Sequence, residues 1–183
     1  MLMLWGQSPA QPKKILIVDD HVPMRKLIAD ALGQASDYQI REARNGQEAL
    51  DALKQDSFDL VISDVMMPGM GGMDLLNHIR AVQSAIPVIM VTAHPATDLT
   101  VSAMKNGAVD FLPKPFDIDE LTFKVSLYLK EKAFLDETEK HRKDTVLDLK
   151  ARTEELSLRS YIYDAIESGA EDTDRVFEHI VDL

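Results

Sequence analysis

Residues 58–73 read F-D-L-V-I-S-D-V-M-M-P-G-M-G-G-M, and the rest of the chain can be interpreted from this stretch. Its apolar run Leu60-Val61-Ile62 has the length of a buried strand and ends on Asp64, and a loop rich in Met, Pro and Gly follows before a helix. Asp64 therefore falls at the carboxyl end of a predicted strand, where open α/β sheets bind ligands. One carboxylate there suits a phosphate-accepting nucleophile, a metal ligand or only a cap.

Strand and helix patterns alternate around this stretch through the first two thirds of the chain. The predicted strands are 14–18, 38–43, 60–64, 87–92 and 109–112, and helical spacing follows each of them. We expect Gly33 and Gly107 to end the first and fourth helices. Five such repeats with short links predict an α/β fold with a doubly wound parallel sheet, covered on both faces.

Five polar residues share one position in this pattern, because each falls at or just past the carboxyl end of an apolar run. They are Asp19, Asp20, Asp64, Thr92 and Lys114. In a parallel sheet these ends lie on one edge, so we expect the five side chains to converge. Carboxylates without His or Cys suit a hard cation such as Mg²⁺, and a lysine suits a phosphoryl oxygen. A carboxylate can also act as the nucleophile and carry an aspartyl-phosphate.

From Lys13 to Lys130 the sequence resembles a receiver domain of the bacterial two-component response regulators. Four motifs in order carry the resemblance: I-L-I-V-D-D at 15–20, D-L-V-I-S-D-V-M-M-P-G-M-G-G at 59–72, V-I-M-V-T-A at 88–93, and G-A-V-D-F-L-P-K-P-F at 107–116. The resemblance implies a flavodoxin-like, five-stranded parallel sheet. It also implies a protein that accepts a phosphoryl group from a histidine kinase or a phosphotransfer protein. Such a protein is no enzyme beyond assisting its own phosphorylation and dephosphorylation.

The resemblance assigns roles to individual residues. Asp64 matches the phosphoacceptor. Asp19 and Asp20 match the pair that holds Mg²⁺ with Asp64, and Met66 matches the position whose backbone carbonyl completes the metal shell. Three further residues match the rest of the machinery: Thr92 the switch hydroxyl, Phe111 the switch aromatic and Lys114 the family's lysine, with a cis Lys114-Pro115 bond.

Each assignment has a structural alternative. The aspartates and Thr92 suit caps, Phe111 suits core packing, and Lys114 suits a solvated lysine. Met66 is large and apolar beside the acceptor, which leaves the phosphate lifetime open. Two other functions compete with the receiver. A phosphohydrolase with an aspartate nucleophile needs two aspartates two apart, whereas Asp19 and Asp20 are adjacent. The other is a dimerisation scaffold that is not phosphorylated.

The last third of the chain reads as one long helix, because no Gly or Pro occurs between Asp117 and Gly169. A stripe with 3–4 spacing predicts a coiled coil and a homodimer; a helix that folds back on the receiver is the alternative. Its apolar members are Val125, Tyr128, Leu135, Val146, Leu149, Leu156 and Tyr163. The stripe is interrupted by Lys132, Glu139, Arg142 and Thr153.

These patterns predict four parts. They are a flexible N-terminal extension (1–12), a receiver domain (13–130), an extended helix (131–168), and a short terminal helix or the start of a missing output domain (169–183). The net charge of −11 and the lack of a basic recognition helix argue against direct nucleic-acid binding. The apolar opening Met1–Trp5 lacks the basic residues of a signal peptide, and no stretch is long enough to span a membrane. We therefore expect a cytoplasmic protein.

Overall fold

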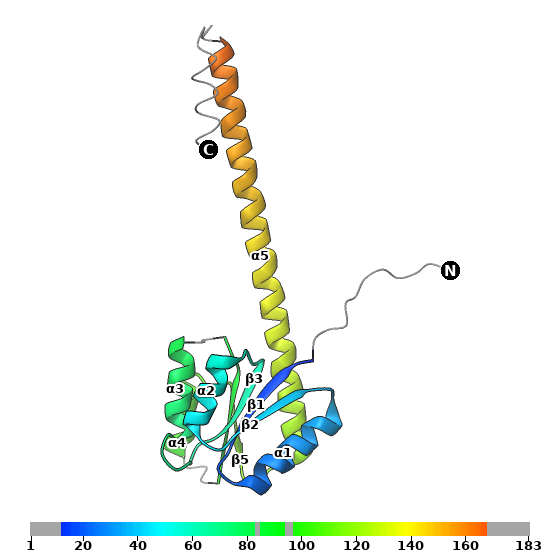
Figure 1. The fold of residues 1–183 in the computed structure, drawn as a ribbon, viewed down its shortest axis with the longest axis vertical. Helices are drawn as coiled ribbons and strands as arrows, with labels where there is room; N and C mark the ends of the chain where they lie inside the picture. The colour runs from blue at the N-terminus through cyan, green and yellow to red at the C-terminus, as the bar shows by residue number, and fades with distance from the viewer. Residues whose placement is uncertain (1–11, 83–84, 94–96, 168–183) are drawn as a thin grey trace, which may run out of the picture. The chain divides into compact units, whose positions relative to one another are not determined.

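A computed structural model describes residues 12–82, 85–93 and 97–167. Within them, five strands and five helices alternate as predicted (Figure 1). The strands are β1 (Lys14–Val18), β2 (Gln39–Ala43), β3 (Leu60–Asp64), β4 (Val88–Thr92) and β5 (Asp110–Pro113). The helices are α1 (Val22–Ala35), α2 (Gly46–Gln55), α3 (Gly72–Val82), α4 (Thr97–Lys105) and α5 (Ile118–Glu167).

The strands form one parallel sheet in the order β2-β1-β3-β4-β5, which confirms the predicted flavodoxin-like fold. Side chains alternate between its two faces. Leu16 packs in the core with α2, α3 and α4, whereas the next residue, Ile17, packs in the core with α1 and α5. Both faces are buried, which explains why the central strands read as continuous apolar runs.

The strand register aligns the carboxyl ends on one edge. Val18 pairs with Ser63, so the residues that follow each of them, Asp19 and Asp64, are next in line. Thr92 pairs with Pro113, one residue before Lys114. The backbone N–H of Asp19 also donates to Ala43 O at 3.2 Å, which extends the β1–β2 pairing by one residue.

The two glycines expected to end helices behave differently. Gly107 ends α4 as predicted: its φ is +94°, and the N–H of Ala108 closes the turn on Ala103 O. The prediction for Gly33 is wrong. Helix α1 continues to Ala35 and ends where the N–H of Ser36 donates to Leu32 O. Without a Cβ clash or a positive φ, Gly33 is simply accommodated in the helix.

Helix α5 runs through both compact units of the chain, Met1–Phe134 and Leu135–Leu183. In the first unit its residues Leu121, Val125 and Leu129 are buried against the sheet. Val125 and the half-buried Tyr128, the first two members of the predicted stripe, thus belong to the core of the first unit. A stripe available to another chain begins only after them.

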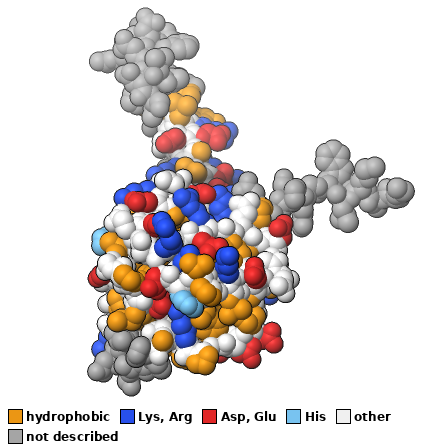
Figure 2. Space-filling model, turned by 60° about the horizontal axis from the view of Figure 1, so that its bottom comes forward, with side chains coloured by type: hydrophobic (Ala, Val, Ile, Leu, Met, Phe, Trp, Pro, Cys, Tyr) orange, Lys and Arg blue, Asp and Glu red, His pale blue; other side chains and the backbone are white. Residues whose placement is uncertain are grey.

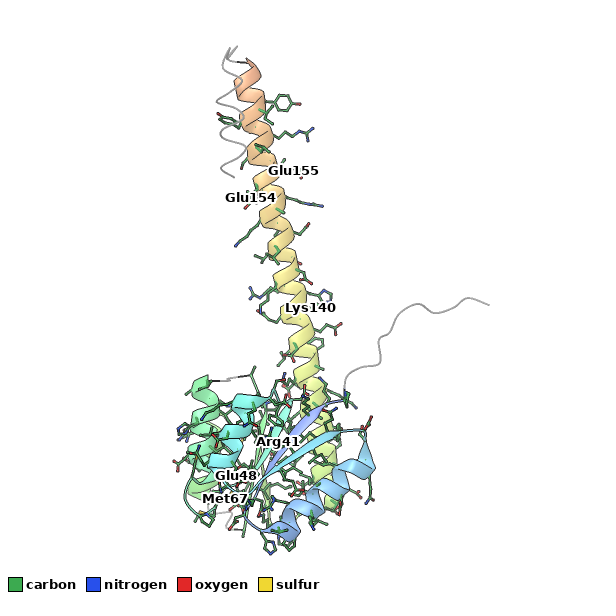
Figure 3. All side chains as sticks on the ribbon, viewed as in Figure 1. Arg41, Glu48, Met67, Lys140, Glu154 and Glu155 are labelled. Carbon is green, nitrogen blue, oxygen red and sulfur yellow. The ribbon has the colours of Figure 1, made fainter. Side chains whose placement is uncertain are left out.

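In the second unit the remaining apolar members of the stripe are exposed. The exposed fractions are 58% for Leu135, 40% for Val146, 58% for Leu149, 63% for Leu156 and 60% for Tyr163. Figure 3 shows charged side chains, among them Lys140, Glu154 and Glu155, along the same part of α5. The predicted extension up to residue 11, the helix end near Ser168 and the terminal helix lie outside the described residues. Among the helices that the structure describes, none combines the length and apolarity needed to cross a membrane.

Candidate functional site

Three carboxylates meet at the carboxyl edge of the sheet. Asp19, Asp20 and Asp64 each offer one oxygen within 4.8 Å of the others. Asp19 and Asp64 are 2% and 8% exposed, whereas Asp20 is open to solvent. In the part of the chain that the structure describes, no other group of three or more His, Asp or Glu residues comes this close. The three carboxylates therefore converge, as predicted from the strand ends.

Lys114 joins two of these carboxylates. Its Nζ donates to Asp19 Oδ2 and to Asp64 Oδ2, each at 2.6 Å, and its side chain is 14% exposed. Burial by itself lowers the pKa of Lys114, but the hydrogen bonds to the two carboxylates outweigh burial and raise the pKa. The ammonium group is thus charged at neutral pH and offsets part of the negative charge, so Lys114 is not the solvated lysine of the alternative reading.

The aspartates do not cap α1. His21 holds the N-cap position and makes no side-chain cap bond. Asp19 Oδ1 accepts from the backbone N–H of His21 at 2.8 Å, and Asp64 Oδ1 accepts from that of Met66 at 3.2 Å. These bonds orient the two buried carboxylates from the loops beside them. No hydrogen bond to the Asp20 side chain is found among the described residues.

Met66 lies in the β3–α3 loop with its side chain 63% exposed. Its backbone is therefore close to the acceptor through the Asp64 bond, while its side chain is available at the surface. Figure 2 shows hydrophobic side chains in patches between acidic and basic ones on one face of the molecule. The role of the Met66 carbonyl as a metal ligand stays a prediction.

Thr92 and Phe111 occupy neighbouring strands. Thr92 is fully buried at the end of β4, and its carbonyl accepts from the backbone N–H of Lys114 at 2.7 Å. Phe111 pairs with Met90 across β4 and β5 and is half-buried against the core under α2–α4. The Lys114-Pro115 peptide is cis, as the resemblance implied. The switching roles of Thr92 and Phe111 stay predictions.

Asp110 ties β5 to α5 directly before Phe111. Its Oδ1 accepts from the Phe111 N–H at 2.7 Å, and its Oδ2 accepts from Lys124 Nζ at 2.6 Å and Tyr128 Oη at 3.0 Å. Burial alone raises the pKa of Asp110, but these donors outweigh burial and lower it. Burial and the bond to Asp110 raise the pKa of Tyr128 to about 12. At neutral pH the carboxylate and the phenol therefore keep the forms that this link needs.

The residues at the edge fit a magnesium ion. Every potential ligand is an oxygen, which is the donor that Mg²⁺ prefers. Three carboxylates face one lysine, so the cluster carries a net negative charge. Two of the three carboxylates are buried. Like charges this close repel one another, and a bound cation relieves the repulsion. Asp19, Asp20 and Asp64 are the side chains that would hold it.

Sequence reasoning missed two residues that build this edge. Arg25 in α1 is buried, and its Nη1 donates to Asp19 O at 2.6 Å. Gly72 starts α3 against the backbone of Asp64, where an added Cβ would collide with the Asp64 carbonyl oxygen. The pair Gly71-Gly72 was a visible signal for close backbone approach, whereas nothing in the helical pattern distinguished Arg25 from an exposed arginine.

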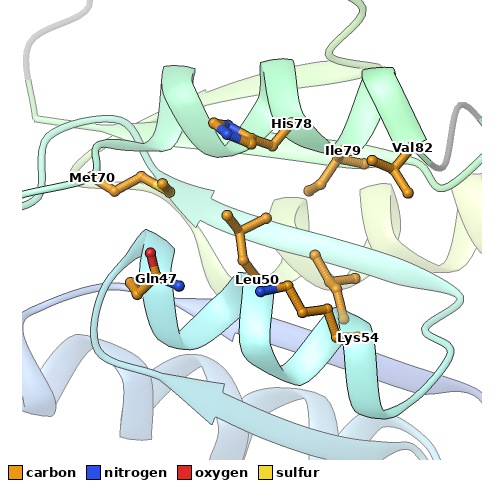
Figure 4. A pocket seen from close by; sticks show the side chains of 8 residues that line it. Gln47, Leu50, Lys54, Met70, His78, Ile79 and Val82 are labelled. Atoms are coloured by element: carbon orange, nitrogen blue, oxygen red, sulfur yellow. The ribbon is translucent and has the colours of Figure 1, made fainter.

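A separate groove lies between α2 and α3 (Figure 4). It has a volume of about 520 Å³ and a largely apolar lining. The lining residues are Gln47, Leu50, Leu53, Lys54, Met70, His78, Ile79 and Val82. None of the carboxylates at the sheet edge lines it, so it is distinct from the site described above.

Comparisons with known proteins agree with this geometry. Residues 15–126 match the response regulator receiver domain family. The DNA-binding transcriptional regulator NtrC of Escherichia coli K12 is 43% identical over 106 residues, which are 58% of this chain and 22% of that protein. The transcriptional regulatory protein FixJ of Bradyrhizobium diazoefficiens is 44% identical over 108 residues, 59% of this chain and 52% of FixJ. The chain thus spans about a fifth to a half of these relatives.

Solved structures show the same fold. The signal receiver domain of an HD domain-containing protein from Pseudomonas fluorescens Pf-5 aligns with a TM-score of 0.68 at 27% identity and covers 73% of this chain and 98% of that one. A CheY-like receiver domain protein from Methanospirillum hungatei aligns with a TM-score of 0.64 at 27% identity, over 67% of this chain and 98% of that one. Fold, strand-edge residues and family match agree: this chain belongs to the response regulator receiver family, with its receiver domain at residues 15–126.

Proposed function

We propose that this chain is the phosphoacceptor of a two-component phosphorelay and takes a phosphoryl group onto Asp64 from a phosphohistidine of a kinase or phosphotransfer protein. The observation that carries the proposal is Lys114, whose ammonium bridges Asp19 and Asp64 beside Asp20. This arrangement pairs a carboxylate nucleophile with a cation that can donate a hydrogen bond to the transferred phosphoryl group.

In the transfer, a carboxylate oxygen of Asp64 forms a bond to phosphorus as the phosphorus–nitrogen bond of the donor breaks, and the imidazole leaves. Asp19, Asp20 and Asp64 would hold Mg²⁺, which would supply positive charge against the phosphoryl oxygens. Lys114 Nζ, already at 2.6 Å from Asp64, would donate to one of these oxygens. Positioning and charge stabilisation account for most of the catalysis in such a transfer.

The phosphoryl group would bias a two-state equilibrium through Thr92 and Phe111. Thr92 ends β4, the strand beside β3 and Asp64, which supports a role for its hydroxyl in bonding the new group. Phe111 lies on the next strand, and its N–H is tied through Asp110 to Lys124 and Tyr128 of α5. A rearrangement of Phe111 would thereby strain or release a contact with α5.

Mg²⁺-dependent phosphorylation tests the proposal. With acetyl phosphate and Mg²⁺, intact-mass measurement of the full chain should show a single added phosphoryl group. Chelation of the divalent ions with EDTA should prevent its appearance, because three carboxylates with only Lys114 as counter-charge keep a net negative charge that repels the anionic donor. Wild-type protein that stays unmodified across donor concentrations, or labelling that ignores EDTA, contradicts the proposal.

We further propose that the exposed stripe of α5 in the second unit forms a homodimer as a coiled coil. Leu135, Val146, Leu149 and Leu156 are exposed apolar members of the stripe, whose positions follow 3–4 spacing when its polar members are included. An isolated helix gains stability by burying such a stripe. Glu139 and Arg142 interrupt the stripe and pair with each other along the helix at 2.7 Å, which satisfies both charges.

Leu149→Glu tests the dimer. It places a charge in the stripe and should convert the dimer to monomer in light scattering coupled to size exclusion. Leu147→Glu is the matched control, since Leu147 is 64% exposed but lies off the stripe, and it should leave the mass unchanged. Beryllofluoride should shift the dimer population or the helicity of the wild type. Equal masses for wild type and Leu149→Glu refute the dimer. If beryllofluoride changes neither the dimer population nor the helicity, the coupling between phosphorylation and the dimer is refuted.

A further inference from the structure

Arg25 is a buried charge that the phosphoryl-transfer scheme does not use. It is the fourth residue of α1 and is 6% exposed, the lowest exposure of a lysine or arginine among the described residues. Its Nε donates to Glu42 Oε2 on β2 at 3.1 Å, but the Glu42 side chain is 41% exposed. A buried guanidinium with one half-exposed partner is a poor source of stability, because desolvation offsets most of the attraction.

The second contact of Arg25 reaches the metal-facing loop. Its Nη1 donates to the carbonyl oxygen of Asp19 at 2.6 Å, and the bond is buried. That oxygen belongs to the Asp19–Asp20 peptide unit, whose six atoms are coplanar. The backbone N–H of Asp19 donates to Ala43 O on β2. The guanidinium thus fixes the orientation of the peptide plane that contains the backbone nitrogen and Cα of Asp20.

The two carboxylates differ in how they are held. The Asp19 side chain is fixed on both oxygens, by the His21 N–H and by Lys114. The Asp20 side chain is exposed and accepts no hydrogen bond from the described residues, so its position depends on its backbone. Among the contacts of the described residues, the bond from Arg25 is the one that fixes the peptide between them.

We infer that Arg25 is a positioning residue for the magnesium site, holding the Asp19–Asp20 peptide so that the Asp20 carboxylate points at the ion. Glu42 in turn holds Arg25 from β2. The inference rests on the proposed function, because it requires that the carboxylates bind Mg²⁺. Outer partners that orient ligands typically account for about 10- to 100-fold in metal affinity.

The sign of the effect separates positioning from charge. Arg25 is a cation near a site for a cation, so if Coulomb repulsion alone acted, its removal would strengthen Mg²⁺ binding. Loss of the peptide contact weakens it. We therefore expect Arg25→Gln to lower the Mg²⁺ affinity of the full chain by about tenfold in calorimetric titration. Arg25→Lys keeps the charge but has one nitrogen where the guanidinium uses two, and it should also bind Mg²⁺ more weakly than the wild type.

Arg41→Gln is the matched control. It makes the same charge change one residue before Glu42, but Arg41 is exposed (labelled in Figure 3) and donates to Gln55 rather than to the acidic loop. Its Mg²⁺ affinity should equal that of the wild type. Far-ultraviolet circular dichroism at the titration temperature restricts the comparison to folded protein, and Arg25→Lys serves if Arg25→Gln does not fold.

The outcomes are distinct. Weaker binding by the folded Arg25 variants and unchanged binding by Arg41→Gln support the positioning role. Equal or tighter binding by a folded Arg25 variant overturns it, even if that variant is less stable, because a purely structural residue alters stability and not the affinity of the folded protein. Wild-type protein without Mg²⁺ binding overturns the proposed function together with this inference.

Discussion

Replacing Asp64 by asparagine should abolish the phosphorylation of this chain by acetyl phosphate. Asparagine keeps the size of the side chain but has no carboxylate oxygen to attack phosphorus, so the expected effect is a complete loss of the added phosphoryl group. The side chain lies 10% exposed at the end of β3, and Lys114 keeps its second partner, Asp19, at 2.6 Å. The substitution therefore removes the nucleophile without leaving the lysine unpaired.

Asp74→Asn is the matched control for this substitution. Asp74 lies in the first turn of α3, is exposed, and is absent from the carboxylate cluster. It should be phosphorylated at the wild-type rate. Intact-mass spectrometry after incubation with acetyl phosphate and Mg²⁺ measures both variants, and circular dichroism checks that each is folded. Persistent labelling of folded Asp64→Asn would move the acceptor to another residue, and a partner interaction indifferent to Asp64 would favour the scaffold reading.

The position of the site was predictable because it follows from the parallel sheet. Apolar runs locate the strands, and parallel pairing places every carboxyl end on the same edge, so Asp19, Asp64 and Lys114 converge without any knowledge of side-chain packing. The role of these residues at the sheet edge could not be predicted from residue type, because helix caps and metal ligands use the same residue types. Distances decided that question for Lys114.

The contacts that were not predictable depend on tertiary packing. Arg25 has the same helical spacing whether it faces solvent or the acidic loop, and only the packing of α1 beside β2 buries it. Val125 and Tyr128 fit a coiled-coil stripe by spacing, but the sheet offers a nearer apolar surface and takes them into the core. Gly33 looked like a helix end, because glycine statistics describe helix ends better than they describe helix interiors.

Replacing Gly72 or Gly33 by alanine should change the free energy of unfolding in opposite directions. An alanine Cβ at Gly72 would collide with the carbonyl oxygen of Asp64, and it would also press on Met90. The obstacle is backbone, which cannot swing aside as a flexible side chain does, so either α3 or the end of β3 must shift. We expect Gly72→Ala to lower the free energy of unfolding by about 3 kcal/mol, at the upper end for overpacked sites.

Gly33→Ala should have the reverse effect. No atom lies within 4 Å of the added Cβ, and Gly33 is inside α1 with helical neighbours on both sides. Alanine loses less chain entropy on folding than glycine and is the better helix former, so the free energy of unfolding should rise by up to about 1 kcal/mol. Urea denaturation of the two variants and the wild type measures both changes on one scale.

The same pair connects stability to the site. Because the obstacle at Gly72 is the backbone of the acceptor itself, any shift that relieves the collision displaces Asp64 relative to Lys114 and the other carboxylates. Gly72→Ala should therefore slow phosphorylation by acetyl phosphate even under conditions where the variant is fully folded, whereas Gly33→Ala should not. If Gly72→Ala keeps the stability and the phosphorylation rate of the wild type, α3 does not start against the backbone of Asp64. That result would contradict the predicted collision.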